Sequence, residues 1–433
     1  MKRVAIIAPD FAPSSLPPAL RVRFFATHLP EFGWEPIVIT VDPKYYEQTI
    51  DHANIDVLPG NLQVIRTKAL PQRFTRRFGF GDLGMRALWH HWNALSQQHK
   101  TKKIDALLIP VPAFLPMILG RLAYMRFRIP YVIDYIDPWR TDYFSRLPKH
   151  QRPRKWWLAD GLAAIVEPLA IRRASHLIAV SRGTNNMVIA NYPYFSPENT
   201  TEIPYGGEEG DAEYVRQHPR HNPIFDPNDG LIHLCSTGHF NPDLSPAANA
   251  LFAALQIGLE RDPKIFGRVR VHFVGTTYAA DAAEAYQVLP LVREKGIESF
   301  ITEHPERVSY FESLQIMSDA HGLLMLGNPS PHYTASKVFP YILSRRPILA
   351  LFHEQSSVVS ILEETQAGRL VTFSSDRPIT SQINTIYEEL KTLISLPVGS
   401  EPATNWAAFE HYTTRSMAQK LAFVLDKVVK THG

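Results

Sequence analysis

The sequence has few of the features that mark several common protein classes. It has one cysteine in 433 residues, Cys235, which lies inside the apolar run LIHLCST. A single thiol excludes a disulfide framework within the chain and a cysteine-based zinc site, so we expect a core residue in a reducing compartment. No apolar run reaches the length that a bilayer requires. Met1–Arg3 leads directly into the short run Val4–Ala8, which predicts a first strand rather than a signal segment. These absences predict a cytoplasmic protein, either soluble or peripheral at the inner face of the membrane.

Charged residues are also scarce, at 20% of the chain against 45% hydrophobic residues. This composition is typical of a folded chain with a large core rather than a disordered one. A length of 433 residues is sufficient for two domains of ordinary size.

The small net charge hides an asymmetry between the two halves of the chain. Residues 1–210 hold 26 lysines and arginines against 18 acidic residues, whereas the remainder holds 19 against 24. Two basic segments also contain aromatic residues, RTKALPQRFTRRFGF (66–80) and KHQRPRKWW (149–157). They suit anionic headgroups at an inner membrane surface or a phosphorylated acceptor, or they form only a solvated basic surface. Because no recognised nucleic-acid-binding module accompanies them, we expect no nucleic-acid partner.

Apolar runs typical of buried strands alternate with helical patterns along most of the chain. The runs are 4–9, 36–41, 105–110, 130–137 and 174–181 in the first half, and 231–238, 269–275, 321–326, 347–352 and 368–373 in the second. Helical patterns separate several of them, at 18–32, 112–127 and 156–173. Continuous apolar strands separated by helices predict parallel sheets covered on both faces. Because a turn-rich segment separates the two sets, we predict an α/β chain of two doubly wound, Rossmann-like domains, residues 1–210 and 211–403.

The segment 310–352 carries the clearest chemical signal. It has the pattern of a helix, a buried strand, a loop, a short helix and a second buried strand. Thr334 or Ser336 is expected to cap the short helix, which would have Lys337 in its first turn. Free backbone N–H groups, a helix start and a lysine together favour an anion, above all a phosphate. The alternative is an ordinary crossover with a solvated lysine.

This segment resembles the donor-binding segment of family 4 glycosyltransferases, which have the GT-B fold. The usual pattern there is approximately P-x-K-x-x-E-Y-x-x-x-x-x-P-[IV], and Lys337, Tyr341 and Pro347 match it. The resemblance implies that the second domain binds a nucleotide-sugar and that the final helix, about 404–433, packs back on the first domain. The donor-binding residues that it implies are Gly238, His239, Gly275, His332, Thr334, Ser336, Lys337 and Tyr341.

The N-terminal half adds further matches to the same family. Residues 4–41 resemble its first strand, loop, ALR-x-R helix and second strand, DYIDPWR (134–140) resembles D-x-R-D-P-W, and IPYGGEEGD (203–211) stands where the family has I-P-N-G-x-D. Ligands of open parallel sheets bind beyond the carboxyl ends of the strands, so we expect residues 10–23 to face a cleft between the domains. The implied acceptor or cleft residues are Asp10, Ser14, Ser15, Arg21, Arg23, Asp134, Trp139, Arg140, Gly206 and Gly207.

Asp137 and Lys337 are the catalytic candidates. Asp137 follows a predicted buried strand and is suited to orient the acceptor hydroxyl or to accept its proton. A capping or salt-bridge role is the alternative for Asp137.

Two parts of the family pattern are missing. Family 4 retaining enzymes commonly carry E-x7-E, and the corresponding positions here are His332 and Pro340. The basic residues that commonly follow the first strand of the second domain are replaced by HFNPDLSP after Gly238, where His239 is a cation only when protonated. Binding of the diphosphate is therefore expected to depend on Lys337, the backbone N–H groups of 334–337 and an arginine from across the cleft.

The resemblance implies a retaining, metal-independent glycosyltransferase that acts in cell-surface glycan or glycoconjugate synthesis. Its donor would be a UDP-, GDP- or dTDP-linked sugar, its acceptor a sugar or a lipid-linked sugar, and no cofactor beyond the donor is expected. The sequence has no Asp-x-Asp triplet of the kind that holds a metal in GT-A enzymes. Two alternatives stay open, a non-catalytic partner subunit and a nucleotide-sugar epimerase with the same fold.

Overall fold

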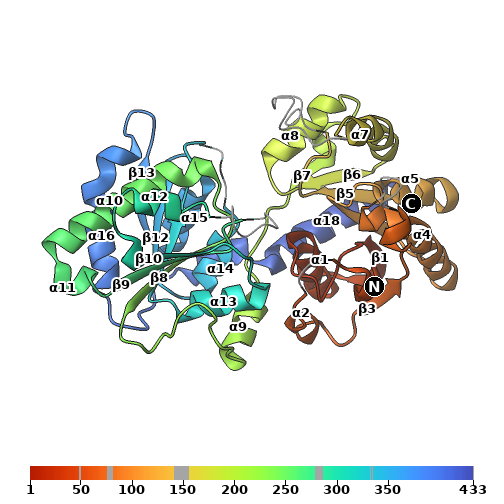
Figure 1. Cartoon of the computed structure of the whole chain (residues 1–433). Helices are drawn as coiled ribbons and strands as arrows, with labels where there is room; N and C mark the ends of the chain where they lie inside the picture. Colours follow the sequence, from red (N-terminus) through yellow and green to blue (C-terminus); the bar gives the residue numbers. More distant parts are fainter. Residues whose placement is uncertain are drawn as a thin grey trace. The chain divides into compact units, whose positions relative to one another are not determined.

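A computed structural model of the chain describes residues 1–47, 50–75, 81–140, 156–277, 286–331, 333 and 335–432. The chain forms two compact units, one of Met1–Tyr205 with Thr414–Gly433 and the other of Gly206–Thr413. Each unit has a parallel sheet with helices packed against it (Figure 1). We call them unit 1 and unit 2.

Both crossings between the units differ from the predicted boundaries. The chain leaves unit 1 after Tyr205 rather than after residue 210, and it returns at Thr414 rather than near 404. Pairing inside unit 2 explains the shift, because Gly207 forms a parallel bridge with Thr413 and its N–H donates to the carbonyl of Tyr412 (2.9 Å). The predicted final helix is therefore two helices, α17 (Trp406–Phe409) in unit 2 and α18 (Thr414–His432) in unit 1.

Unit 1 contains a seven-stranded parallel sheet in the order β3-β2-β1-β4-β5-β6-β7. Its strands are β1 (Lys2–Ile7), β2 (Trp34–Val41), β3 (Gln63–Thr67), β4 (Ala106–Val111), β5 (Tyr131–Tyr135), β6 (His176–Ala179) and β7 (Thr200–Glu202). The order reverses between β1 and β4. The loops that follow these two strands therefore diverge at the carboxyl edge of the sheet, which is where open α/β sheets bind ligands.

Helices cover both faces of this sheet. Along β1, Val4 and Ile6 point into one core and Ala5 and Ile7 into the other, as the alternation of a strand requires. The first core is covered by α1 (Pro17–His28) and α18, and the second by α4 (Leu83–Thr101), α5 (Met117–Phe127), α7 (Trp156–Ile171) and α8 (Arg182–Asn191). Two short helices, α2 (Ala53–Asp56) and α3 (Gln72–Thr75), lie in the long connections.

Unit 2 contains a six-stranded parallel sheet in the order β10-β9-β8-β11-β12-β13, which reverses between β8 and β11. Its strands are β8 (Ile232–Thr237), β9 (Val269–Val274), β10 (Ile301–His304), β11 (Gly322–Leu326), β12 (Ile348–His353) and β13 (Arg369–Phe373). Its other helices are α9 (Glu209–Gln217), α10 (Ser245–Arg261), α11 (Pro263–Phe266), α12 (Leu289–Arg293), α13 (Tyr310–Asp319), α14 (Val338–Leu343), α15 (Ser357–Thr365) and α16 (Ile383–Ile394).

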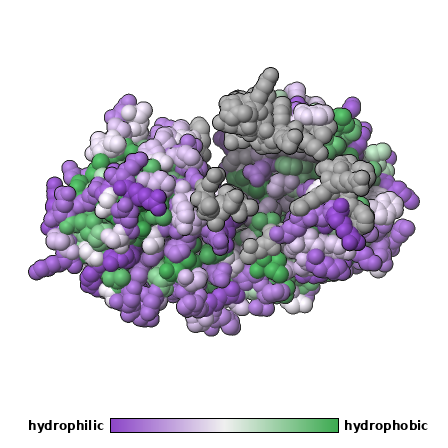
Figure 2. All heavy atoms as spheres, in the orientation of Figure 1, coloured by the Kyte–Doolittle hydropathy of each residue, from purple (hydrophilic) through white to green (hydrophobic). Residues whose placement is uncertain are grey.

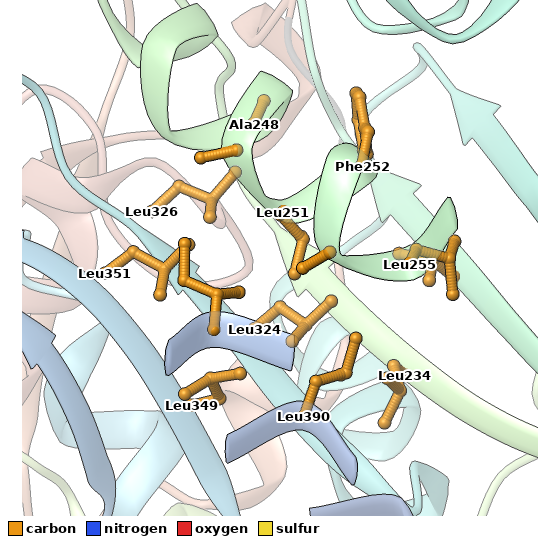
Figure 3. Packing of buried hydrophobic residues seen from close by; sticks show 14 of the residues in the cluster. Leu234, Ala248, Leu251, Phe252, Leu255, Leu324, Leu326, Leu349, Leu351 and Leu390 are labelled. Carbon is orange, nitrogen blue, oxygen red and sulfur yellow. The ribbon is translucent and has the colours of Figure 1, made fainter. Parts of the chain in front are cut away.

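The main core of unit 2 lies between one face of this sheet and two helices. Figure 3 shows side chains of α10, including Leu251 and Leu255, meeting Leu234 and Leu324 of the sheet and Leu390 of α16. This packing holds the carboxyl ends of the strands in a fixed arrangement, from which the loops of the candidate site extend.

All ten predicted strands are present, whereas β3, β7 and β10 were not predicted. The predicted helix 112–127 begins only at Met117, because Pro112–Pro116 forms a loop after β4. Across the parts of the chain that are described, no helix combines the length and the apolar character that a membrane crossing needs.

Candidate functional site

The site of unit 2 begins with two glycines at the carboxyl ends of neighbouring strands. Gly238 follows β8 with φ +98°, and Gly275 follows β9 with φ +74°. Only glycine adopts such angles without strain, so both positions keep the backbone uncovered by a side chain. The N–H of Gly238 donates to the carbonyl of Val274, and the N–H of Gly275 to that of His304, each at 2.8 Å. The structure therefore brings the predicted Gly238 and Gly275 together at one edge of the sheet.

Lys337 lies beside Gly238, at the point where the sheet order reverses. Its Cδ is 4.0 Å from the position that a Cβ on Gly238 would take. Its Nζ donates to the carbonyl of Thr237 (3.2 Å) and lies 5.9 Å from the ring centre of Tyr341. The half-buried ammonium has lost solvent, which lowers the pKa of Lys337 to about 8. The arrangement places one cation next to a strand end that carries no side chain, which suits a phosphate group.

The loop after β8 is held by a buried carboxylate that the sequence reasoning missed. The Nδ1–H of His239 donates to the carbonyl of Thr276 (2.9 Å), whose hydroxyl donates to Oε1 of Glu303 (2.6 Å). Oε2 of Glu303 accepts the N–H groups of Val288 (2.8 Å) and Leu289 (2.9 Å). Because Nδ1 of His239 carries the proton, the other ring nitrogen is an acceptor in the neutral form. Glu303 thus fixes the loops after β8 and β9 relative to each other.

Arg307 is a second residue that the sequence reasoning missed. It is exposed in the loop after β10, and its Cα is 3.8 Å from the position of a Cβ on Gly275. Its position after a strand could not be recognised from the sequence, because β10 itself was not predicted. Arg307 supplies a positive charge at the same edge of unit 2 as Lys337.

Other predicted donor residues take different roles in the structure. Lys337 precedes α14 as its N-cap instead of lying in the first turn, and no side chain caps this six-residue helix. Ser336 is exposed next to Lys337. Tyr341 is fully buried, and its hydroxyl accepts the N–H of Thr237 (2.8 Å), so it supports the end of β8 instead of facing a ligand. His332 and Thr334 lie outside the described residues.

In unit 1, the structure contradicts the predicted acceptor roles of Arg21 and Asp134. Their side chains are 2% and 0% exposed. Nε and Nη2 of Arg21 donate to the two carboxylate oxygens of Asp134 (2.7 and 3.0 Å), and Nη2 and Nη1 also donate to the carbonyls of Ile203 (2.7 Å) and Pro204 (3.1 Å). The pair is a buried structural clamp between α1, β5 and the segment that leads out of unit 1.

The loop after β1 also uses most of its predicted site residues for structure. Ser14 is buried, and its Oγ accepts the N–H of Leu16 (3.3 Å), while Oγ of Ser15 accepts from the side-chain amide of Asn54 (3.3 Å). Arg23 is buried with its guanidinium carbon 4.7 Å from the ring centre of Phe24.

Asp10 is the exception in this loop, because it lines a pocket. The pocket measures about 150 Å³ and lies where the loops after β1 and β4 diverge. Its lining residues are Ala8, Pro9, Asp10, Leu16, Pro18, Asp82, Pro110, Pro112 and Ala113. Asp82, which was not predicted, also caps α4 by accepting the N–H of Met85 (2.8 Å). This pocket is the candidate acceptor site of unit 1.

Three further candidates follow β5. Asp137 is exposed, and neighbouring protein atoms displace enough water to raise its pKa above the ordinary value. Trp139 stacks on Phe114, with ring centres 4.9 Å apart and planes 8° apart. Arg140 is half-buried, and its hydrogen bond with Tyr192 raises its pKa above the ordinary value of an arginine.

Gly206 and Gly207 belong to unit 2 rather than to the acceptor domain in which they were predicted. A Cβ on Gly207 would lie 2.8 Å from Cδ1 of Leu343 and from Cζ of Phe409. Packing alone therefore accounts for a glycine at position 207, and the ligand role of Gly207 stays a prediction.

A known family and several solved structures are similar to this chain. Residues 18–206 match a family described as a glycosyl transferase 4-like domain. The structure is similar to that of HepE from Anabaena in complex with UDP-glucose, with a TM-score of 0.57, 16% identity, and 99% of this chain and 100% of that chain covered. It is also similar to a UDP-forming α,α-trehalose-phosphate synthase from Burkholderia xenovorans (TM-score 0.60, 12% identity, 99% of both chains). A search of proteins with curated descriptions found no match.

These two structures are 16% and 12% identical to the chain, so the likenesses establish the fold alone. The predicted α/β architecture, GT-B with two Rossmann-like domains, is confirmed. In the described part of the chain, no three His, Cys, Asp or Glu side chains are grouped so that they could hold a metal ion.

Proposed function

We propose, from the premise that this chain is a family 4-like glycosyltransferase with the GT-B fold, that unit 2 binds the diphosphate of a nucleotide-sugar and that unit 1 binds the acceptor. The observation that carries the proposal is the placement of Lys337 beside the open backbone of Gly238 at the reversal point of the sheet in unit 2. An ammonium is a usual partner of phosphate oxygens, and the missing side chain at Gly238 lets them come close to it, although the N–H of Gly238 itself donates to the carbonyl of Val274.

The donor that we propose first is a UDP-sugar. Structural neighbours include a protein solved with UDP-glucose and a UDP-forming synthase, which supports this choice over GDP- and dTDP-sugars. No further cofactor is proposed.

In the proposed reaction, the glycosidic bond between the sugar and the diphosphate breaks, and a bond from the acceptor oxygen to the same carbon forms. Lys337 stabilises the negative charge that develops on the leaving diphosphate. Asp137, which follows β5 at the carboxyl edge of the sheet in unit 1, orients the acceptor hydroxyl. We propose retention of configuration without a metal ion, with the leaving phosphate taking the proton of the hydroxyl. The acceptor is a sugar or a lipid-linked sugar in cell-surface glycan synthesis, and the enzyme acts in the cytoplasm at the inner membrane surface.

Nucleotide-dependent thermal stability tests the donor half of this proposal. UDP at a hundredfold excess over its Kd is expected to raise the free energy of unfolding by about 2.7 kcal/mol, because it binds only the folded chain. GDP, dTDP, ADP and CMP, each tested separately, show whether the protein prefers one base. Uridine, which has no phosphates, is the control for the contribution of the diphosphate. If no nucleotide raises the melting temperature at millimolar concentration, the enzyme proposal fails and a non-catalytic partner subunit takes its place. Sugar conversion without an acceptor would instead indicate an epimerase.

The affinity for UDP is also expected to depend on pH through Lys337. Its pKa of about 8 in the free protein means that the ammonium is charged at pH 7 and largely neutral at pH 9. The Kd for UDP should therefore rise about tenfold from pH 7 to pH 9, since binding must then take up a proton. Lys337→Arg, which stays charged, should show a much smaller rise in titration calorimetry. An equal rise in both proteins would remove Lys337 as the cause.

A further inference from the structure

The outer surface of α5 and α7 in unit 1 is apolar, although the solvent side of a surface helix is normally polar. Met125 of α5 and Ile165 of α7 are 61% and 64% exposed. We define the α5–α7 apolar face as Leu122, Met125, Trp157, Leu162, Ile165 and Leu169, all of which are exposed large side chains. Figure 2 shows hydrophobic residues on the part of unit 1 where Figure 1 draws α7 and α5.

Contacts between the two helices make this face continuous. Nη1 of Arg121 on α5 donates to the carbonyl of Leu169 on α7 (2.7 Å), and both helices cover the same core. On α7, Leu162, Ile165 and Leu169 are spaced by three and four residues, so they lie in one stripe. The side of α7 that faces the protein contains small or short residues such as Ala163 and Ala170. Ile171 is also buried, so the helix has large apolar side chains on its outer side as well as on its inner side.

Positive charges surround the C-terminal ends of both helices. Arg126 and Arg128 at the end of α5, and Arg172 and Arg173 after α7, are exposed. None of these four forms an ion pair with an acidic residue among those that are described. Asp160 is the exposed acid of α7. An apolar stripe with a tryptophan and adjacent arginines matches an interface between headgroups and acyl chains.

We propose that the α5–α7 apolar face docks on an anionic lipid bilayer, with the stripe of α7 inserted among the acyl chains and the four arginines at the headgroups. Charge favours a bilayer over a second copy of the chain. Two such faces pressed together would bring eight arginines without an acidic partner among the described residues into one interface, whereas anionic headgroups neutralise them.

This docking places the candidate acceptor edge near the membrane. The helix α7 connects the parallel strands β5 and β6, so it begins on the carboxyl side of the sheet, where Asp137 follows β5. Trp157 lies at that end of the helix. A lipid-linked acceptor would then reach the edge of unit 1 from the membrane surface; this last step rests on the proposed function, and the docking itself does not.

Sedimentation with vesicles tests the docking on the full chain. The protein is expected to bind vesicles that contain phosphatidylglycerol in phosphatidylcholine, and to bind phosphatidylcholine alone much more weakly. Ile165→Glu should lower the partition coefficient about tenfold or more, because it puts a charge where an apolar side chain enters the acyl region. Phe423→Glu is the matched control, since Phe423 is 73% exposed on α18, over the opposite face of the same sheet. It should change the partition coefficient less than about twofold.

A second pair of variants tests the charges. Arg126→Glu with Arg172→Glu should reduce binding to the anionic vesicles and weaken its dependence on salt, whereas Lys420→Glu on α18 should not. Circular dichroism melts establish that each variant is folded.

Two outcomes with vesicles overturn the proposal. Either the wild-type protein stays in solution with anionic vesicles, or Ile165→Glu binds them as the wild type does. A wild-type dimer in light scattering that Ile165→Glu converts to a monomer overturns it in favour of self-association. UDP should raise the melting temperature of Ile165→Glu as much as that of the wild type. A loss of vesicle binding in this variant can then be told apart from a loss of UDP binding, which would concern the proposed function.

Discussion

Asp134→Asn is expected to lower the free energy of unfolding by about 3–5 kcal/mol, the usual cost of breaking a buried ion pair from one side. The substitution leaves the guanidinium of Arg21, which is 2% exposed, without its counter-charge. Arg21 also donates to the carbonyls of Ile203 and Pro204, so its displacement would disturb the segment that leads out of unit 1. Urea denaturation followed by circular dichroism measures the loss.

Two comparisons isolate the cause of this destabilisation. Asp426→Asn removes an exposed ion pair with Lys2 in the same unit (2.7 Å) and should cost less than about 1 kcal/mol. The double variant Arg21→Met, Asp134→Leu removes both charges and should be more stable than Asp134→Asn alone, because no buried charge remains unpaired. If Asp134→Asn loses no more stability than Asp426→Asn, the structural role of the Arg21–Asp134 pair is contradicted.

Lys337→Met is expected to weaken UDP binding by about 10- to 100-fold. Hydrogen bonds to charged groups contribute about 1.5–3 kcal/mol, and each 1.4 kcal/mol is about a factor of ten in affinity. Methionine fills similar space without the half-buried ammonium, so the fold should tolerate the change. Titration calorimetry at pH 7 measures the effect, and steady-state turnover with the donor that binds best should fall in parallel.

The matched control for this variant is Lys264→Met. Lys264 is an exposed lysine of α11 in the same unit and takes no part in the candidate site. Its substitution should leave the Kd for UDP within about twofold of wild type. If Lys337→Met still binds UDP and its affinity is less than threefold weaker than that of the wild type, the diphosphate lies elsewhere in unit 2.

The strands that sequence reasoning missed share one physical property, which is their position at sheet edges. β3 and β7 are the two edges of the sheet in unit 1, and β10 is an edge of the sheet in unit 2. Interior strands are buried on both faces and appear as continuous apolar runs, whereas β3 (QVIRT) and β7 (TTE) are largely half-exposed and polar. The missed edge strand β10 also concealed Glu303 and Arg307, because a residue is placed at a strand end only once the strand is known.

The candidate site shows the same division between local and distant information. Lys337 was predicted from its local segment, and Gly238 and Gly275 were implied by the resemblance to family 4; the structure brings all three to one edge of unit 2. Arg21 and Asp134 also lie at strand and helix positions that suggested a ligand role. Their ion pair joins residues 113 positions apart, and no local pattern reports such a partner.

The sequence alone determined the class of this protein, because burial on both faces of parallel strands leaves an apolar run that recurs with each βα unit. Lys337 also stood out from its local pattern, because a lysine near the start of a helix favours an anion, and the resemblance to family 4 added Gly238 and Gly275 to the proposed phosphate site. Tertiary structure decided which charged residues are available to a ligand, since burial of Arg21 against Asp134 and of Tyr341 beneath β8 depends on contacts between distant segments. It also decided that the stripe of α7 faces outward, because a helical pattern shows which residues share a side but not which side the sheet covers.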